Sequence, residues 1–166
     1  MRYIDNHCPK EHDPTVEDYY KVKIKIKEGE TKEFKILDTA GEEDYQNMLD
    51  QWIKVASGFI LVFAVNDEES FEDIKIRLKR IEKNEVNKLP IILVGNKCDL
   101  VDKRTISETQ GIELANSFGG KYYETSALND LNGNIKVVFS EIAKMISDKN
   151  DLGEEGKSKC FTCCAF

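Results

Sequence analysis

Two short runs of nearly uninterrupted apolar residues constrain the fold most strongly. Residues 58 to 65, GFILVFAV, and residues 89 to 95, LPIILVG, each have the length of a strand that is covered on both faces. Between them, helical spacing of apolar residues predicts a helix from residue 69 to about 86, with Ser70 as its cap. The recurring residues are Ile74, Leu78 and Ile81. Strand, helix and strand in this order indicate an α/β fold with a parallel sheet.

The remaining segments extend this pattern. Residues 21 to 27, KVKIKIK, alternate lysine with apolar residues, which predicts a half-buried strand whose lysine face suits a sheet edge. Residues 32 to 37 return as its hairpin partner. Ser107 and Gln110 match a capping box at the start of another helix, and residues 121 to 127 form the next strand. A last helix carries an apolar stripe of Ile135, Val138, Phe139, Ile142 and Ile146.

Composition and charge exclude several classes of protein. With 166 residues, 40% hydrophobic and 33% charged, the chain suits one soluble globular domain. The net charge of -7 argues against nucleic-acid binding, which needs a basic face. No signal-peptide pattern and no bilayer-length apolar run occur, so we expect a cytosolic setting. We divide the chain into a domain over residues 1 to 147 and a flexible polar tail over residues 148 to 166.

Polar motifs follow three of the predicted strands, at the edge where parallel sheets bind ligands. They are DTAG at residues 38 to 41, NKCD at residues 96 to 99 and ETSA at residues 124 to 127. In NKCD, Asn96 and Asp99 offer an amide and a carboxylate, and a carboxylate that accepts two parallel N–H bonds suits the edge of guanine. A polar turn that caps the next element explains the same four residues equally well.

Two weaker motifs also admit two interpretations. Ser126 and Ala127 offer backbone N–H groups to the carbonyl of a base, or they form an ordinary loop. Thr15, within DPTVEDYY at residues 13 to 20, offers a hydroxyl to a metal ion, or it belongs to an ordinary turn. Each motif is modest alone, but their order and their positions after strands agree.

As a set and in this order, DPTVEDYY, LDTAGEEDY, VGNKCDL and ETSA resemble the Ras family of small GTPases, closest to the Ras and Rap branch. The resemblance covers nearly the whole chain. It implies a P-loop GTPase-like fold with a six-stranded, mostly parallel sheet and five helices. It also implies a molecular switch that binds GTP or GDP with Mg²⁺ and hydrolyses GTP to GDP and phosphate, a reaction for which Ras is itself a standard worked example.

The resemblance assigns metal and phosphate contacts by position. Thr15 would coordinate Mg²⁺ and sense the γ-phosphate, Asp38 would hold Mg²⁺ through water, and the backbone N–H of Gly41 would meet the γ-phosphate. Glu42 stands where the family usually has a glutamine that orients the attacking water. A carboxylate cannot donate an N–H to the transition state, so we expect altered turnover unless Glu42 is simply a solvated acid.

The resemblance also assigns a base pocket. The amide and carboxylate of NKCD would recognise guanine, Lys97 would lie along the base, and Ala127 would donate its N–H to the guanine carbonyl. Leu128 replaces the usual lysine, and Cys8 replaces a common aromatic residue, and both changes weaken the pocket. The implied nucleotide-binding residues are Asn96, Lys97, Asp99, Ser126, Ala127 and Leu128.

Partners follow from the same resemblance. Residues 12 to 20 would form the first switch and effector loop, and residues 38 to about 52 would form the second switch. Effector proteins, exchange factors and GTPase-activating proteins would bind a monomer, and a partner would add a strand beside residues 20 to 26. The effector residues would be His12, Asp13, Pro14, Thr15, Val16, Glu17, Asp18, Tyr19 and Tyr20.

The phosphate-binding motif of the family, G-x-x-x-x-G-K-[ST], does not occur in the sequence, whose first glycine is Gly29. By resemblance, its strand would lie in the middle of the sheet, so we expect the neighbouring strands to lose a ladder on each side. Losing three charge-assisted hydrogen bonds would weaken nucleotide binding by about 10³-fold or more. Either Met1 is an internal methionine of a longer product, or the short form is a nucleotide-poor relative. The preserved downstream spacing favours the first explanation.

The last four residues, CCAF, match a prenylation box with Cys163 as the modified residue, and the terminal Phe favours a geranylgeranyl group. Two prenyl groups on the paired cysteines are the alternative. One lipid chain anchors weakly, so Cys160 is the expected palmitoylation site. We therefore expect a lipid anchor at the cytoplasmic face of the plasma membrane or of an endomembrane.

A rival hypothesis treats the chain as a non-enzymatic adaptor. It would be prenylated and free of nucleotide, and its acidic effector loop would capture a basic partner. The acidic residues of that loop are Glu11, Asp13, Glu17 and Asp18.

Overall fold

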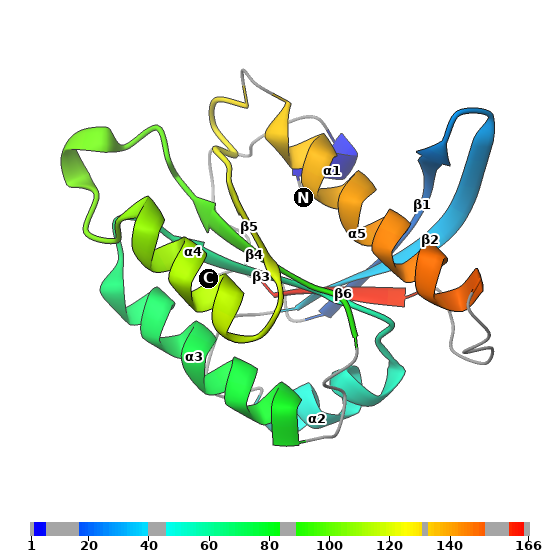
Figure 1. Ribbon diagram of the computed structural model, residues 1–166, viewed down its shortest axis with the longest axis horizontal. Helices are drawn as coiled ribbons and strands as arrows, with labels where there is room; N and C mark the ends of the chain where they lie inside the picture. The colour runs from blue at the N-terminus through cyan, green and yellow to red at the C-terminus, as the bar shows by residue number, and fades with distance from the viewer. Residues whose placement is uncertain are drawn as a thin grey trace.

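The computed structural model describes residues 2–5, 17–39, 46–83, 89–130, 133–151 and 160–164. These residues form one six-stranded sheet with helices on both faces (Figure 1). The strands are β1 (Glu17–Lys27), β2 (Glu30–Thr39), β3 (Phe59–Ala64), β4 (Ile91–Asn96), β5 (Lys121–Glu124) and β6 (Cys160–Cys164). The helices are α1 (Arg2–Asp5), α2 (Gln46–Val55), α3 (Glu68–Lys83), α4 (Glu108–Ser117) and α5 (Asn134–Asp151), with a 3-10 helix η2 (Val101–Lys103).

The sheet is mostly parallel, as predicted. Its strand order is β1-β2-β6-β3-β4-β5. Among the strands of the described residues, only β1 and β2 pair antiparallel, as the expected hairpin, and Gly29 takes the positive φ of 78° in the turn between them. The lysine-bearing strand β1 lies at one edge of the sheet, which confirms the edge prediction from its alternating sequence.

The central strand comes from the C-terminal end of the chain. β6 pairs in parallel with β2, from Lys35 opposite Cys160 to Thr39 opposite Cys164, and on its other edge with β3. The prediction of a flexible tail from residue 148 was wrong here, because α5 continues to Asp151 and β6 joins the sheet. The predicted loss of a ladder on each side was also wrong where β6 pairs, which is along Lys35 to Thr39 of β2 and along Phe59 to Leu61 of β3.

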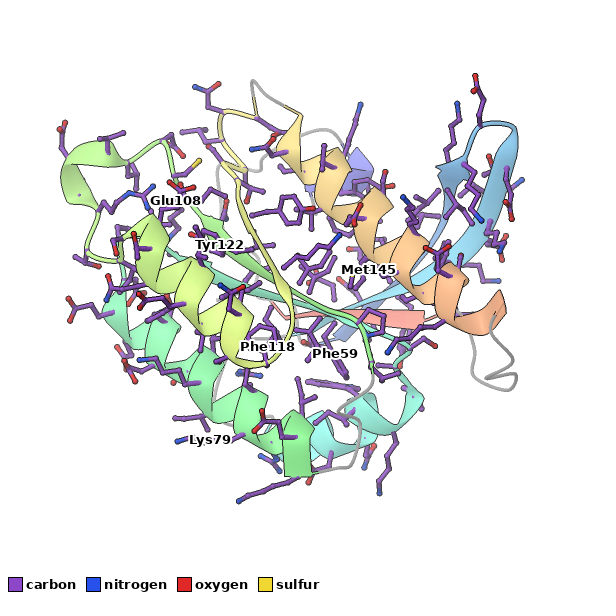
Figure 2. All side chains as sticks on the ribbon, viewed as in Figure 1. Phe59, Lys79, Glu108, Phe118, Tyr122 and Met145 are labelled. Carbon is purple, nitrogen blue, oxygen red and sulfur yellow. The ribbon has the colours of Figure 1, made fainter. Side chains whose placement is uncertain are left out.

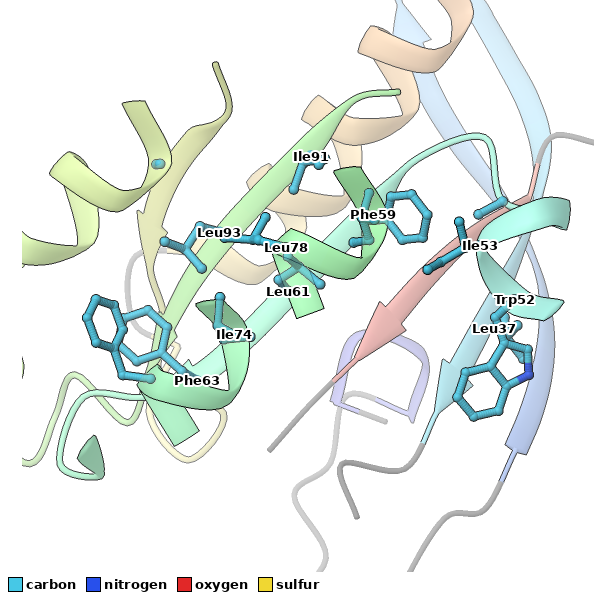
Figure 3. Packing of buried hydrophobic residues seen from close by; sticks show 14 of the residues in the cluster. Leu37, Trp52, Ile53, Phe59, Leu61, Phe63, Ile74, Leu78, Ile91 and Leu93 are labelled. Atoms are coloured by element: carbon cyan, nitrogen blue, oxygen red, sulfur yellow. The ribbon is translucent and has the colours of Figure 1, made fainter. Parts of the chain in front are cut away.

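One hydrophobic cluster lies between the sheet and the helices α2, α3 and α4. β3 is buried along its whole length, as its uninterrupted apolar sequence predicted. Phe59, Leu61 and Phe63 of β3 meet Ile74 of α3 and Ile53 of α2 in this cluster (Figure 3). Helices therefore position β3 and its neighbour β4 from this face.

A second cluster covers the opposite face. Ile24 of β1 and Phe34 of β2 pack with α5 through residues that include Ile142 and Ile146. α1 joins this layer through Tyr3, whose ring stacks on Phe139 of α5 with centroids 4.0 Å apart. The predicted apolar stripe of the last helix is thus the face that packs on the sheet.

Helix ends follow the sequence in one case and depart from it in another. α4 begins at a full capping box between Ser107 and Gln110, as predicted. α3 begins at Glu68, and its first N–H groups are capped by Asp67 rather than by Ser70, because Asp67 Oδ1 accepts the N–H of Glu69 at 3.1 Å. The Ser70 hydroxyl instead accepts the N–H of Ala64 and ties the helix to β3.

The two clusters make a direct prediction about α3. Ile74 is fully buried and Ile76 is 58% exposed in the same helix. Ile74→Ala should lower the free energy of unfolding by about 2–5 kcal/mol, because it removes core contacts and leaves a cavity. Ile76→Ala, the matched control with the same change in helix propensity, should shift stability by no more than about 0.5 kcal/mol. Urea unfolding measures both, and equal losses would contradict the described packing.

Candidate nucleotide-binding site

Two predicted motifs meet at the carboxyl ends of neighbouring parallel strands. β4 ends at Asn96, β5 ends at Glu124, and the strands pair from Ile92 opposite Lys121 to Gly95 opposite Glu124. Because parallel strands end at the same edge, NKCD and the last three residues of ETSA (TSA, residues 125 to 127) leave the sheet side by side. The topology that the apolar runs predicted therefore brings the two candidate base-recognition motifs together.

Asn96 ties the two loops directly. Its side-chain Oδ1 accepts the N–H of Ala127 and the hydroxyl of Thr125, each at 3.2 Å. The N–H of Cys98 donates to the carbonyl of Thr125 at 3.1 Å, and the N–H of Thr125 donates to the carbonyl of Gly95 at 2.9 Å. These bonds engage the acceptor side of the Asn96 amide, so its Nδ2 group is the part that can donate to a ligand.

The rest of NKCD turns outward. Lys97 adopts a left-handed backbone conformation, with φ of 61°, and its carbonyl accepts the N–H of Leu100 at 3.0 Å in a tight turn. The side chains of Lys97 and Asp99 are exposed. The turn interpretation and the base interpretation are thus compatible, because the turn presents the Asp99 carboxylate to solvent, where a ligand can reach it.

The second loop is closed by its own side chains. Ser126 is buried, and its hydroxyl accepts the N–H of Asn129 at 2.8 Å, so it shapes the loop. The N–H of Ala127, which the resemblance assigns to a base carbonyl, is directed at Asn96 here. Leu128 is 71% exposed. An exposed aliphatic side chain beside the loop can cover one face of a planar ligand.

A half-buried polar cluster supports both loops, and the sequence analysis missed it. Arg104 donates to both oxygens of Glu124, at 2.7 and 2.8 Å, and the hydroxyl of Tyr122 donates to Glu124 at 2.8 Å. Burial alone would raise the pKa of Glu124, but the bonds from Arg104 and Tyr122 outweigh it and lower that pKa. Arg104 and Glu124 are 20 residues apart, so no local sequence pattern predicts their pairing.

Tyr122 fits a space that two glycines leave. Figure 2 labels its side chain near α4, and a Cβ placed on Gly111 of α4 would lie 2.4 Å from its ring. A Cβ on Gly95 of β4 would lie 2.4 Å from its hydroxyl oxygen. Glycine at these two positions lets the ring reach Glu124, directly below the base-recognition loops.

Asp38 marks the other end of the candidate site. It lies near the end of β2, and β6 and β3 separate β2 from β4 in the sheet. Three strand spacings of about 4.8 Å separate the two residues across the sheet, and Asp38 is level with Ile92, four residues before Asn96, so Asp38 and Asn96 lie on the order of 20 Å apart. This separation leaves room for an extended ligand whose two ends differ in chemistry.

The surroundings of Asp38 suit a cation. Burial, together with repulsion from Asp18 directly opposite in the register of β1, raises the pKa of this carboxyl to about 6. A positive ion would relieve both effects. Within the described residues, no group of three His, Cys, Asp or Glu side chains gathers as a metal site.

Several predicted residues cannot be placed. Thr15, Gly41, Glu42, Cys8 and residues 12 to 16 lie outside the described residues. The remaining effector residues, Glu17, Asp18, Tyr19 and Tyr20, begin β1, where the side chain of Tyr19 is 61% exposed. The predicted lipidation residues, Cys160 and Cys163, lie in β6.

Comparison with known proteins decides the family. A family model described as the Ras family matches residues 1–148. The chain belongs to the Ras family. It is also similar to the Ras-like protein rasB of Dictyostelium discoideum, with 42% identity over 160 residues that cover 96% of this chain and 79% of that protein.

Membership makes this Ras-family chain a relative of small GTPases, which in general bind GTP or GDP with Mg²⁺ and interact with effectors, exchange factors and GTPase-activating proteins. No helix in the described part of the chain is both long enough and apolar enough to cross a membrane.

The raised pKa of Asp38 predicts a pH effect on stability. The unfolded chain ionises this group near pH 3.8 and the folded chain near pH 6, so folding becomes less favourable as pH rises through this interval. In chelator-treated protein, Asp38→Asn should become progressively more stable than the parent chain over the same interval. Urea unfolding at several pH values measures the difference.

Asp102→Asn is the control, because Asp102 is an exposed carboxylate in η2. Its stability profile should follow that of the parent chain at every pH. Parallel profiles for Asp38→Asn and the parent would show that Asp38 is not the group responsible.

Proposed function

We propose that the chain is a guanine-nucleotide-dependent switch in signal transduction that binds and hydrolyses GTP. The observation that carries the proposal is the joining of the two base-recognition loops by Asn96, with the Asp99 carboxylate exposed beside them. Asn96 would donate to an acceptor of the base, and Asp99 would accept two N–H bonds from guanine. Adenine lacks that pair of donors, so the site would prefer guanine.

Asp38 would serve the phosphate end. Mg²⁺, when bound, neutralises phosphate charge, and Asp38 would hold it through water while Thr15 supplies a hydroxyl. The ionised form of Asp38, which the protein alone disfavours, would then be stabilised. The Gly41 N–H would meet the γ-phosphate, and Glu42 would lie where water is oriented for attack, with altered turnover as the consequence of its missing N–H donor.

The switch segments connect nucleotide state to partners. GTP would order residues 12 to 20 and residues 38 to about 52, and hydrolysis would release them. Effectors, exchange factors and GTPase-activating proteins would recognise the difference. An effector strand would pair with the outer edge of β1, which has a neighbour on one side only in the described sheet.

Asp99→Asn tests base recognition. GDP affinity of the full chain should fall by about tenfold or more, because a hydrogen bond to a charged group contributes about 1.5–3 kcal/mol. Affinity for xanthosine diphosphate should rise relative to GDP, because the new amide can donate to the additional carbonyl of xanthine. Calorimetric titration with GDP, ADP and xanthosine diphosphate measures both effects.

Asp102→Asn again provides the matched control, since it removes a carboxylate three residues from Asp99 and should leave GDP affinity unchanged. A parent chain that bound ADP as well as GDP would contradict the proposed base site. So would an Asp99→Asn variant with the GDP affinity of the parent.

A second candidate function rests on a different observation. β6 lies between β2 and β3, where the family resemblance places the strand that leads into the phosphate-binding loop. This arrangement favours a nucleotide-free adaptor that captures a basic partner through its acidic effector loop. The nucleotide content of the purified chain separates the candidates, because stoichiometric guanine nucleotide fits only the switch.

The C-terminal box would anchor either form. Geranylgeranylation of Cys163, with palmitoylation of Cys160 as the second signal, would hold the protein at the cytoplasmic face of the plasma membrane or an endomembrane. The alternative of two prenyl groups on Cys163 and Cys164 stays open. The switch and the adaptor would both depend on this short C-terminal segment for their anchor.

Cys163→Ser tests the anchor. The substitution removes the thiol that forms the thioether, so the protein should move from the membrane fraction to the soluble fraction of cells. Fractionation with immunoblotting measures this distribution. Cys98→Ser is the control, since Cys98 lies in the NKCD turn, and it should leave the distribution unchanged. Persistence of the Cys163→Ser variant on membranes would argue against this anchor.

A further inference from the structure

The segment with the expected lipidation cysteines is also the strand that joins the two halves of the sheet (Figure 1). β1 and β2 form one half, β3, β4 and β5 form the other, and in the described sheet β6 alone lies between them. The backbone of Cys163 is in register with Asp38 of β2 and with Ile60 of β3. Both edges of this residue are therefore paired.

The surroundings of β6 show that its place is part of the packed interior. Leu37 of β2 and Phe59 of β3, on the flanking strands, are fully buried. α2 lies against β6, and Figure 3 shows Ile53 of this helix beside it. Withdrawing β6 would leave the facing edges of β2 and β3 without hydrogen-bond partners.

Prenylation places a different demand on the same residues. The Cys163 thiolate would attack C1 of geranylgeranyl diphosphate, a C–S bond would form, and the C–O bond to diphosphate would break as diphosphate leaves with the electron pair. The thiol proton would pass to water. The transferase must surround an accessible C-terminal peptide to catalyse this step. A strand paired on both edges cannot enter an enzyme's active site.

We propose that residues 160–164 have two mutually exclusive uses, as the central strand of the sheet and as the substrate of a prenyltransferase, so that sheet insertion withholds the anchor. The inference rests on the proposed lipid anchor and adds a means by which the fold regulates its attachment. Modification then requires release of β6, and its rate follows the fraction of molecules in which β6 is released. The attached lipid in turn keeps the segment out of the sheet.

The test compares the full chain with a synthetic peptide of residues 152 to 166, using a protein geranylgeranyltransferase and labelled geranylgeranyl diphosphate. The protection ratio is the kcat/KM of the peptide divided by that of the chain. We expect a ratio on the order of ten or more for the natural sequence. Each 1.4 kcal/mol of free energy needed to release β6 lowers the released fraction tenfold, and the rate of modification falls with it. A ratio near one would overturn the inference.

Thr162→Pro provides the release variant. Thr162 is paired with Leu37 and with Phe59, and proline removes a ladder N–H and is excluded from central strands. The protection ratio of this variant, measured against its own proline-containing peptide, should fall to near one. Ser158→Pro is the control, because it places the proline before β6 and should retain the natural ratio. Equal ratios for the two variants would count against strand insertion.

Two further readouts separate the possible failures. If the natural peptide itself is not prenylated, the proposed anchor fails, and the inference that rests on it fails too. Amide hydrogen exchange tests the strand without the enzyme: residues 160–164 should exchange slowly in the natural chain and rapidly in Thr162→Pro. Rapid exchange in the natural chain would overturn the inference even if the peptide is a good substrate.

Discussion

The parallel pairing of β6 with both β2 and β3 is the interaction on which the sheet depends. β2 and β3 do not pair with each other in the described structure, so the hairpin half and the β3–β4–β5 half are joined by a strand of five residues. Backbone hydrogen bonds supply this junction, and they do not require a particular side-chain pattern. That property explains how a segment whose residues suit lipid chemistry can also complete a sheet.

Elements that a local pattern defines could be predicted from the sequence. The KVKIKIK alternation gave the edge strand β1, and the Ser107–Gln110 capping box marked the start of α4. β6 could not be predicted, because CFTCC suggests exposed chemistry, and its parallel partners lie more than a hundred residues away in the sequence. Pairing over such a distance depends on which strand edges remain open, and no window of sequence shows this.

The candidate site also combines features that the sequence predicted with features that it did not. NKCD and ETSA were predicted to follow strands at the ligand-binding edge of a parallel sheet, and the hydrogen bonds between them show that they are neighbours. The bond from Asn96 to Ala127 was not predicted, nor was the support from Arg104 and Tyr122. These contacts depend on side-chain directions at loop ends, which hydrophobic periodicity does not determine.

The two ends of the candidate site therefore have unequal support. The base end stands on the continuous β3–β4–β5 ladders and on the half-buried Arg104–Glu124 pair, and none of these pairings includes β6. The cation end depends on β2, whose Asp38 and Thr39 pair with Cys163 and Cys164. Releasing β6 would remove a ladder from the strand that carries Asp38, while leaving the ladders under Asn96 intact. Any change in the C-terminal strand should therefore alter the structure around Asp38 before it alters the structure around Asn96.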